Sequence, residues 1–241
     1  MKKILLCIAI ALSMTMLCSA KKTIYLIGDA TLASNGVANL NSYGWGGAFA
    51  QCVNSQIDVI NQAEAGESTH TLVNNKRLVR LVASSKADDI VLLQLGQNDM
   101  RNEYNDMYYS TEEMTEKLIE IIKYLEAKDL IIILATPLAQ PYYKDSILID
   151  RMGGYPDVIR HVAKLKDVYL LDMHSATFEW LKEIGEEESK RYFTQVPTEA
   201  TRIEYNLTEI GSVAVCNLAI QELKKRRIRL FNRYLLASVT Q

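Results

Sequence analysis

The chain has 241 residues, 49% of them hydrophobic and 23% charged, with a formal net charge of −2 at pH 7. This composition is ordinary for a globular protein, and the length suits one α/β domain better than two small ones. The charge balance gives no support for a nucleic-acid partner, so we expect none.

Residues 1–20 have the pattern of a secretory signal peptide. Residues 1–3 are basic at two positions, residues 4–17 are apolar, and Cys18, Ser19 and Ala20 offer a small-residue cleavage site. The apolar stretch of about 14 residues is shorter than the ~20 that a bilayer-spanning helix needs. We expect an exported protein, periplasmic or secreted, whose residues 21–241 form a single domain without stable membrane insertion.

Five short runs rich in Ile, Leu and Val recur along the chain without polar alternation, as is typical of strands buried on both faces. They occupy residues 23–28, 57–61, 90–95, 130–135 and 168–172. Segments with helical spacing separate them, most clearly residues 111–127, where Ser110 or Thr111 can cap the helix with Glu113 as reciprocal partner. The pattern predicts a doubly wound, five-stranded parallel sheet in an α/β fold.

The basic run at residues 224–234 is expected to extend a C-terminal amphipathic helix. A solvated helix face is the simpler interpretation, and a surface for anionic glycan or membrane lipid is the alternative. Beyond the signal, Cys52 and Cys216 stand in apolar, helix-like contexts, so we expect two separately buried thiols rather than a disulfide. No Cys/His cluster has metal-ligand spacing, and we expect neither a metal nor a cofactor.

Polar residues and glycine follow three of the predicted strands. Asp29 and Ala30 follow the first strand, Gly66 the second and Asn98 the third. Because parallel strands end at one edge of a sheet, a glycine N–H and an asparagine amide there can form an oxyanion hole. Tyrosines gather in the loops after the third and fourth strands and either stack on sugar rings or pack internally: Tyr104, Tyr108, Tyr109, Tyr142 and Tyr143.

Four blocks stand in order along the chain: Gly28-Asp29-Ala30-Thr31, Tyr43-Gly44-Trp45-Gly46, Ala65-Gly66-Glu67-Ser68 and Gln94-Leu95-Gly96-Gln97-Asn98-Asp99. They resemble the Gly-Asp-Ser-Thr, Gly-Trp-Gly, Ala-Gly-Arg-Ser and Gln-Phe-Gly-His-Asn-Asp blocks of the SGNH (GDSL-type) hydrolases, in their rhamnogalacturonan acetylesterase-like branch. The resemblance covers residues 23–223. It implies a flavodoxin-like, three-layer α/β/α sandwich and a carbohydrate acetylesterase ancestry.

The chain departs from that family at all three positions of the catalytic triad. Ala30 stands where the family has its nucleophilic serine. The family's final Asp-x-x-His-Leu-Asn-x-x-Gly-Ala block aligns with residues 203–212, which places Ile203 at the acid position and Asn206 at the base position. The positions that the resemblance assigns to oxyanion or ligand binding are retained: Asp29, Ala30 (through its N–H), Gly66 and Asn98.

Acyl transfer at such a site needs an oxygen nucleophile, an imidazole base and a carboxylate that orients the base. We therefore expect an esterase-like pseudoenzyme that binds carbohydrate or a small acylated ligand without hydrolysing it. One alternative is an active acetylesterase that uses Ser68 and His70, although Ser68 also suits a helix N-cap and His70 a rim position. Another is a non-catalytic partner-binding scaffold. The sequence leaves the oligomeric state open.

Two further histidines have structural interpretations. His161 lies in a helical stretch, residues 157–166, and is expected on a solvated face. His174 follows the fifth strand, and we expect it to be a loop residue that makes a backbone hydrogen bond.

Overall fold

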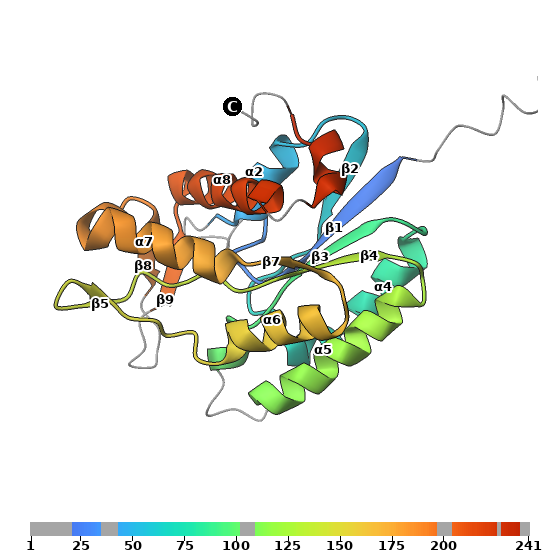
Figure 1. The fold of residues 1–241 in the computed structure, drawn as a ribbon, viewed down its shortest axis with the longest axis horizontal. Helices are drawn as coiled ribbons and strands as arrows, with labels where there is room; N and C mark the ends of the chain where they lie inside the picture. The colour runs from blue at the N-terminus through green and yellow to red at the C-terminus, as the bar shows by residue number, and fades with distance from the viewer. Residues whose placement is uncertain (1–20, 35–42, 102–108, 197–203, 226–227, 237–241) are drawn as a thin grey trace, which may run out of the picture.

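Each of the five apolar runs forms a parallel strand of one sheet (Figure 1). The computed structural model describes residues 21–34, 43–101, 109–196, 204–225 and 228–236. The strands lie in the order β2-β1-β3-β4-β7, and the sheet predicted from the sequence is confirmed. Their bounds are Lys22–Gly28 for β1, Ile57–Asn61 for β2, Ile90–Gln94 for β3, Ile131–Ala135 for β4 and Tyr169–Leu171 for β7.

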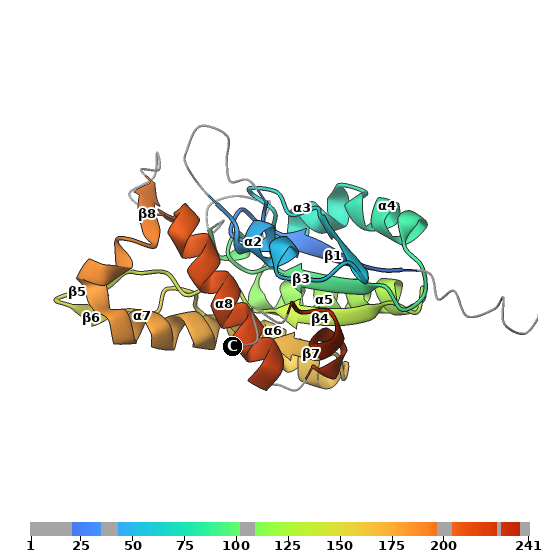
Figure 2. The ribbon, with the colours of Figure 1, turned by 90° about the horizontal axis from the view of Figure 1, so that it is seen from above.

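Helices cover both faces of the sheet, which confirms the three-layer sandwich (Figures 1 and 2). One layer holds α3 (Thr69–Asn74), α4 (Arg77–Ser84), α5 (Thr111–Glu126) and α6 (Tyr155–Leu165). The other holds α2 (Trp45–Gln51), α7 (Met173–Ser189), α8 (Glu209–Lys225) and the 3₁₀ helix η2 (Arg229–Arg233). A second 3₁₀ turn, η1 (Asp99–Arg101), follows β3.

Successive side chains of each strand enter opposite hydrophobic cores, because side chains alternate across a sheet. In β1, Ile24 and Leu26 pack in the core beneath α2, α7 and α8. Tyr25 and Ile27 pack in the core beneath α3–α6. This two-sided burial explains why the sequence of the strands shows no polar alternation.

The helix predicted over residues 111–127 is α5, and its start has the expected capping box. Ser110 is the N-cap, its side chain accepting from the Glu113 N–H while the Glu113 carboxylate accepts from the Ser110 N–H. Met114, Leu118 and Ile122 are among the side chains that α5 buries against the sheet. His161 is exposed on α6, as expected.

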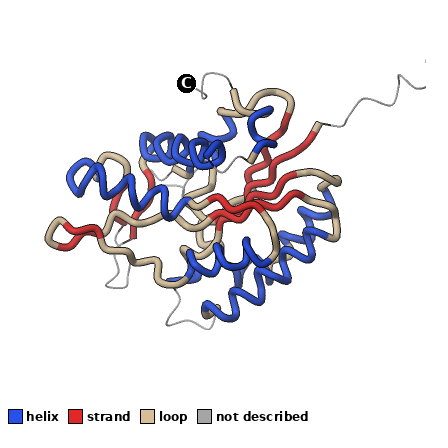
Figure 3. Tube along the Cα trace, viewed as in Figure 1, coloured by secondary structure: helices blue, strands red, loops and turns tan. Residues whose placement is uncertain are grey.

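Two antiparallel hairpins were not predicted. They are β5 (Tyr143–Lys144) with β6 (Ile147–Leu148), and β8 (Phe193–Val196) with β9 (Glu204–Leu207). Both lie with α7 at one end of the molecule, past the carboxyl ends of the sheet strands (Figures 1 and 3). The Tyr43 N–H donates to the Leu207 carbonyl, so β9 joins the segment that leads into α2.

The basic run at residues 224–234 does not continue α8 as one helix. The described part of α8 ends at Lys225, and Ile228 has φ −71° and ψ 75°, outside the helical region. The chain then forms η2, because Ile228 and Phe231 are buried in the core shared by α2 and α8. Burial of these apolar side chains turns the segment back onto the protein.

Cys52 and Cys216 are free thiols without a disulfide, as expected, but they are neighbours rather than separate. Cys52 is half-buried at the C-terminus of α2 and Cys216 is buried in α8, with their sulfur atoms 3.9 Å apart. The predicted separation was wrong because local sequence carries no sign that α2 packs against α8. In the part of the chain that the structure describes, no helix is both long and apolar enough to cross a bilayer; residues 1–20, predicted as a signal peptide, lie outside it.

Candidate active-site crevice

The three loops singled out in the sequence meet at one edge of the sheet. β1 pairs with both β2 and β3, so the loops that carry Ala30, Gly66 and Asn98 leave neighbouring strands. Hydrogen bonds join them directly: the Glu64 N–H donates to the Gly28 carbonyl (2.9 Å), and Asn98 Nδ2 donates to the Glu67 carbonyl (2.7 Å). The three loops predicted to wall a crevice at this edge are therefore in contact with one another.

A chain of buried hydrogen bonds fixes the turn that holds Ala30. Asp29 Oδ1 accepts from the N–H and the hydroxyl of Thr31, at 2.8 and 2.7 Å. Gln94 Nε2 donates to Thr31 Oγ1 (2.6 Å), and Trp45 Nε1 donates to Gln94 Oε1 (2.9 Å). The Thr31 hydroxyl donates to Asp29 and accepts from Gln94, so it is engaged in hydrogen bonds that hold the turn.

Glu67, at a position where the resemblance has arginine, is a buried carboxylate. It is 3% exposed and pairs with Arg77, whose Nη1 lies 2.5 Å from Oε2. Thr71 Oγ1 and Asn75 Nδ2 donate to Oε1. Burial raises the pKa of Glu67, and these donors and Arg77 oppose that rise. Arg77 also binds Glu64, so the loop after β2 is tied to the start of α4.

Asp99 joins the loop after β3 to the first turn of α3. Its carboxylate accepts from the Thr69 N–H (2.9 Å to Oδ1) and from the Gly96 N–H (3.0 Å to Oδ2), and the residue is fully buried. Burial raises the pKa of Asp99 to about 6, against the hydrogen bonds from Thr69 and Gly96. The second and third walls of the crevice are thus linked through one carboxyl group.

Ser68 and His70 lie on the second wall, and their side chains have different partners. Ser68 is the N-cap of α3: its Oγ accepts from the Thr71 N–H (3.2 Å), and the residue is 1% exposed. The His70 ring packs on Tyr109 with ring centroids 5.2 Å apart, and its Nε2 lies 3.3 Å from Asn74 Nδ2. No hydrogen bond joins Ser68 to His70.

Three of the residues assigned to oxyanion binding have hydrogen-bond donors available for a ligand. The N–H groups of Ala30 and Gly66 make no hydrogen bond to any residue that the structure describes, and Gly66 has φ +84° with open space where a Cβ would point. Asn98 uses one amide hydrogen on Glu67, which leaves the second for a ligand. Their roles in ligand binding remain predictions.

The position predicted for the base lies on β9. Asn206 is half-buried on β9, paired with Thr194 of β8. Ile203 lies outside the described residues, as do Tyr104 and Tyr108. Among the described residues, no group of three His, Cys, Asp or Glu side chains is arranged to hold a metal ion.

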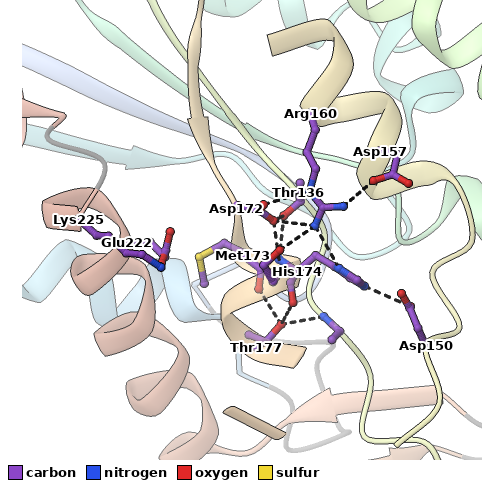
Figure 4. A network of polar contacts seen from close by, with 12 residues as sticks. Thr136, Asp150, Asp157, Arg160, Asp172, Met173, His174, Thr177, Glu222 and Lys225 are labelled. Carbon is purple, nitrogen blue, oxygen red and sulfur yellow. Dashed lines mark hydrogen bonds and ion pairs between the residues drawn. The ribbon is translucent and has the colours of Figure 1, made fainter. Parts of the chain in front are cut away.

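His174 is part of a polar network that sequence analysis missed (Figure 4). It lies in the first turn of α7 rather than in a loop; its Nε2 is 3.1 Å from Asp150 Oδ1 and its Nδ1 is 3.3 Å from Arg160 Nη2. Arg160 also binds both oxygens of Asp172. Burial opposes ionisation of Asp172, but the Arg160 bonds outweigh it and lower its pKa to about 2.

This network follows β7, at the sheet edge three strands from β1, so it is distant in topology from Ala30. Its partners come from α6 and from the segment after β6. These side chains provide hydrogen-bond partners for one another. We infer that the network holds α6 against the start of α7.

A cavity of about 450 Å³ lies between the two hairpins and the end of α7. Tyr142, Tyr143 and Tyr205 line it, together with Glu186 and Lys190. The sequence singled out the first two tyrosines, whereas Tyr205 was missed because β9 was not predicted. Tyr205 immediately precedes Asn206, so the cavity borders the strand that carries the base position.

Comparison with known proteins agrees with this geometry. Residues 26–194 match the model of the GDSL-like lipase/acylhydrolase family. A probable rhamnogalacturonan acetylesterase of Bacillus subtilis, YesY, is 27% identical over 206 residues, covering 84% of this chain and 92% of the relative. A second B. subtilis protein, the rhamnogalacturonan acetylesterase RhgT, is 25% identical over 210 residues, covering 84% and 89%.

Solved structures share the fold. B. subtilis YxiM superimposes with a TM-score of 0.72 at 25% identity over 87% of this chain, which spans only 58% of the YxiM chain. Axe2, an acetylxylan esterase of Geobacillus stearothermophilus, gives a TM-score of 0.62 at 18% identity, covering 86% of this chain and 96% of Axe2. Because the family model matches residues 26–194, most of the chain, this chain belongs to the GDSL-like lipase/acylhydrolase family.

Proposed function

We propose that this chain is a non-hydrolysing member of its family that binds acetylated carbohydrate in the crevice. The observation that carries the proposal is Ala30, half-buried in a rigid turn where an acyl hydrolase needs its nucleophile. A methyl group has no electron pair with which to attack an ester carbonyl.

The remaining chemistry supports the same conclusion. Asn206 does not take up a proton near neutral pH, and Ile203 has no carboxylate with which to orient a base. An oxyanion hole and binding alone leave a residual acceleration of ~10³–10⁴-fold over water in a triad-deleted protease, against at least ~10⁶-fold for a working enzyme. Thr31 and Ser68 both have hydroxyls engaged in structural hydrogen bonds.

The ligand class rests on the relatives and on the aromatic cavity. Two curated relatives carry the name rhamnogalacturonan acetylesterase, which favours an acetylated pectic oligosaccharide as ligand. Tyrosine rings such as Tyr142 and Tyr205 can pack against sugar rings in the cavity that borders β9. The signal-like pattern of residues 1–20 fits an exported protein that meets such polysaccharides outside the cell.

Turnover is tested on p-nitrophenyl acetate and on acetylated pectic oligosaccharides. We expect no turnover by the wild type above a boiled control, and measurable turnover from Ala30→Ser/Ile203→Asp/Asn206→His, with Ala30→Ser alone near background because its serine lacks a base. Wild-type turnover that is lost in Ser68→Ala would instead establish the Ser68/His70 esterase.

Binding is tested by calorimetry with the same oligosaccharides. We expect wild-type binding, weakened about 10-fold or more in Tyr142→Ala by the loss of ring stacking. Tyr124→Ala is the matched control, since Tyr124 is 41% exposed on α5 in the opposite helix layer. Absence of both binding and turnover would favour a partner-binding scaffold.

A further inference from the structure

Two thiols that are 164 residues apart in sequence lie side by side between α2 and α8. Cys52 Sγ and Cys216 Sγ are 3.9 Å apart. Cys216 lies within α8, which holds it in place, and Cys52 is the residue at which the seven-residue helix α2 ends. A disulfide bond of about 2.05 Å requires the sulfur atoms to approach by roughly 2 Å, a movement that side-chain rotation at a helix end can supply.

We propose that Cys52 and Cys216 form a redox couple that closes to a disulfide between α2 and α8. Only one of the two thiols is within reach of an oxidant. A groove of about 760 Å³ between the helices is lined by both cysteines, and Cys52 is half-buried whereas Cys216 is 1% exposed. Cys52 is therefore the thiol that reacts first, and Cys216 is the resolving thiol.

The oxidant required is a molecule that carries its own disulfide. Cys52 releases its proton to solvent, and its thiolate attacks one of the two oxidant sulfur atoms. The oxidant S–S bond breaks: the attacked sulfur stays bound to Cys52 as a mixed disulfide, and the other sulfur leaves as a thiolate that solvent protonates. Cys216 then loses its proton to solvent, and its thiolate attacks Cys52 Sγ. The mixed disulfide bond breaks, and the oxidant sulfur that was bound to Cys52 leaves and is protonated to a thiol. Two electrons pass from the two cysteines to the oxidant.

The order of these steps agrees with the surroundings of the sulfur atoms. Burial raises the pKa of the Cys216 thiol, and the neighbouring Cys52 raises it further. A mixed disulfide on Cys52 removes the charge and the hydrogen bond that Cys52 contributes, so capping Cys52 makes Cys216 easier to ionise. The first step thus prepares the second.

The disulfide would connect two elements that flank the crevice. α2 begins at Trp45, whose N–H donates to the Thr31 carbonyl (2.8 Å) and whose ring N–H donates to Gln94. α8 follows β9, which carries Asn206. The bond would close a loop of residues 52–216, which includes Gly66, Asn98 and Asn206 but not Asp29 or Ala30. Closing this loop should stabilise the folded protein against unfolding.

The test uses the full chain, incubated with oxidised glutathione or with reduced dithiothreitol and then alkylated. We expect oxidation to give a linked pair of proteolytic peptides containing Cys52 and Cys216, lighter by the mass of two hydrogen atoms than the two free peptides. The oxidised protein should melt about 5 °C or more above the reduced protein. This shift in melting temperature should vanish in Cys52→Ser, which removes the accessible thiol, and in Cys216→Ala, which removes the buried one.

A Cys7→Ala/Cys18→Ala variant is the matched control and should keep both the linked peptide and the melting shift. Alkylation of both Cys52 and Cys216 after the oxidising incubation, in a protein whose denatured form does cross-link, would overturn the proposal. So would stable glutathionylation of Cys52 that Cys216 does not resolve. Because the mass readout is made on the wild type, misfolding of a variant does not affect it.

Discussion

Most polar side chains around the crevice hold its loops rather than face a ligand. Asp29 accepts from Thr31, Glu67 pairs with Arg77, and Asp99 accepts from Thr69 and Gly96. Groups fixed in this way lose little further entropy when a ligand binds, which favours recognition. This fixed network supports the binding role that we propose.

Asp99 predicts a pH dependence of stability. Its pKa rises from 3.8 to about 6 on folding, so the folded state holds the proton more tightly than the unfolded chain. The resulting stabilisation is complete below about pH 4 and is lost as the pH rises through 6, a change of about 3 kcal/mol in the free energy of unfolding. Urea unfolding between pH 4 and 7 measures it.

The Asp99→Asn variant should lack this contribution, so the wild-type minus variant difference should fall with pH across that window. Asp129→Asn serves as the exposed-carboxylate control, at a positive φ that asparagine tolerates. A pH-independent difference for Asp99→Asn would contradict the prediction.

At the scale of elements, α2 reaches the crevice because glycine lets backbones meet. A Cβ on Gly46 would lie 2.1 Å from the Leu32 carbonyl oxygen, and a Cβ on Gly44 would lie 2.1 Å from the Ala33 carbonyl oxygen. This contact holds Trp45 over Gln94, to which its ring N–H donates. The two glycines of the Gly-Trp-Gly sequence thus allow α2 to pack closely against the segment that follows Ala30.

Gly46→Ala should destabilise the protein by about 3 kcal/mol, because backbone atoms cannot move aside as a flexible side chain can. Chemical denaturation measures the loss. Gly154→Ala is the matched control, since its Cβ would meet only the Thr111 methyl group at 3.2 Å. Equal losses in the two variants would show that the close backbone contact at Gly46 does not decide the effect.

At the scale of the whole molecule, the C-terminal segment completes the core on the α2–α8 side. The Phe231 ring meets Phe49 edge-on with centroids 5.9 Å apart. Tyr234 and Leu236 bond to the backbone at the end of α2: the Asn54 N–H donates to the Tyr234 carbonyl and the Leu236 N–H donates to the Cys52 carbonyl. The segment therefore belongs to the folded domain and is not a free basic tail.

Phe231→Ala should lower the free energy of unfolding by about 3–5 kcal/mol, through lost burial and the cavity left behind. Its exposed neighbour provides the control: Asn232→Ala should change stability by no more than ~0.5 kcal/mol. Thermal and urea unfolding both report the difference. A small loss for Phe231→Ala would mean that the segment is dispensable to the core.

The sequence by itself determined the five strands, α5 with its cap, and the edge where Ala30, Gly66 and Asn98 meet. These features depend on apolar periodicity and strand-end residues, which are local in sequence. The predicted substitution of the triad rests on the same kind of local signal, since it depends on departures from blocks of the family, and it stays a prediction.

Only the tertiary structure decided what those residues contact. The Cys52–Cys216 pair spans 164 residues, and the network of His174, Arg160 and Asp150 joins α7 to α6 and to the segment after β6. The return of the C-terminal segment and the tyrosine-lined cavity depend on packing of the same non-local kind. A contact between distant segments is set by the packing of whole elements, so it leaves no periodic pattern in the chain.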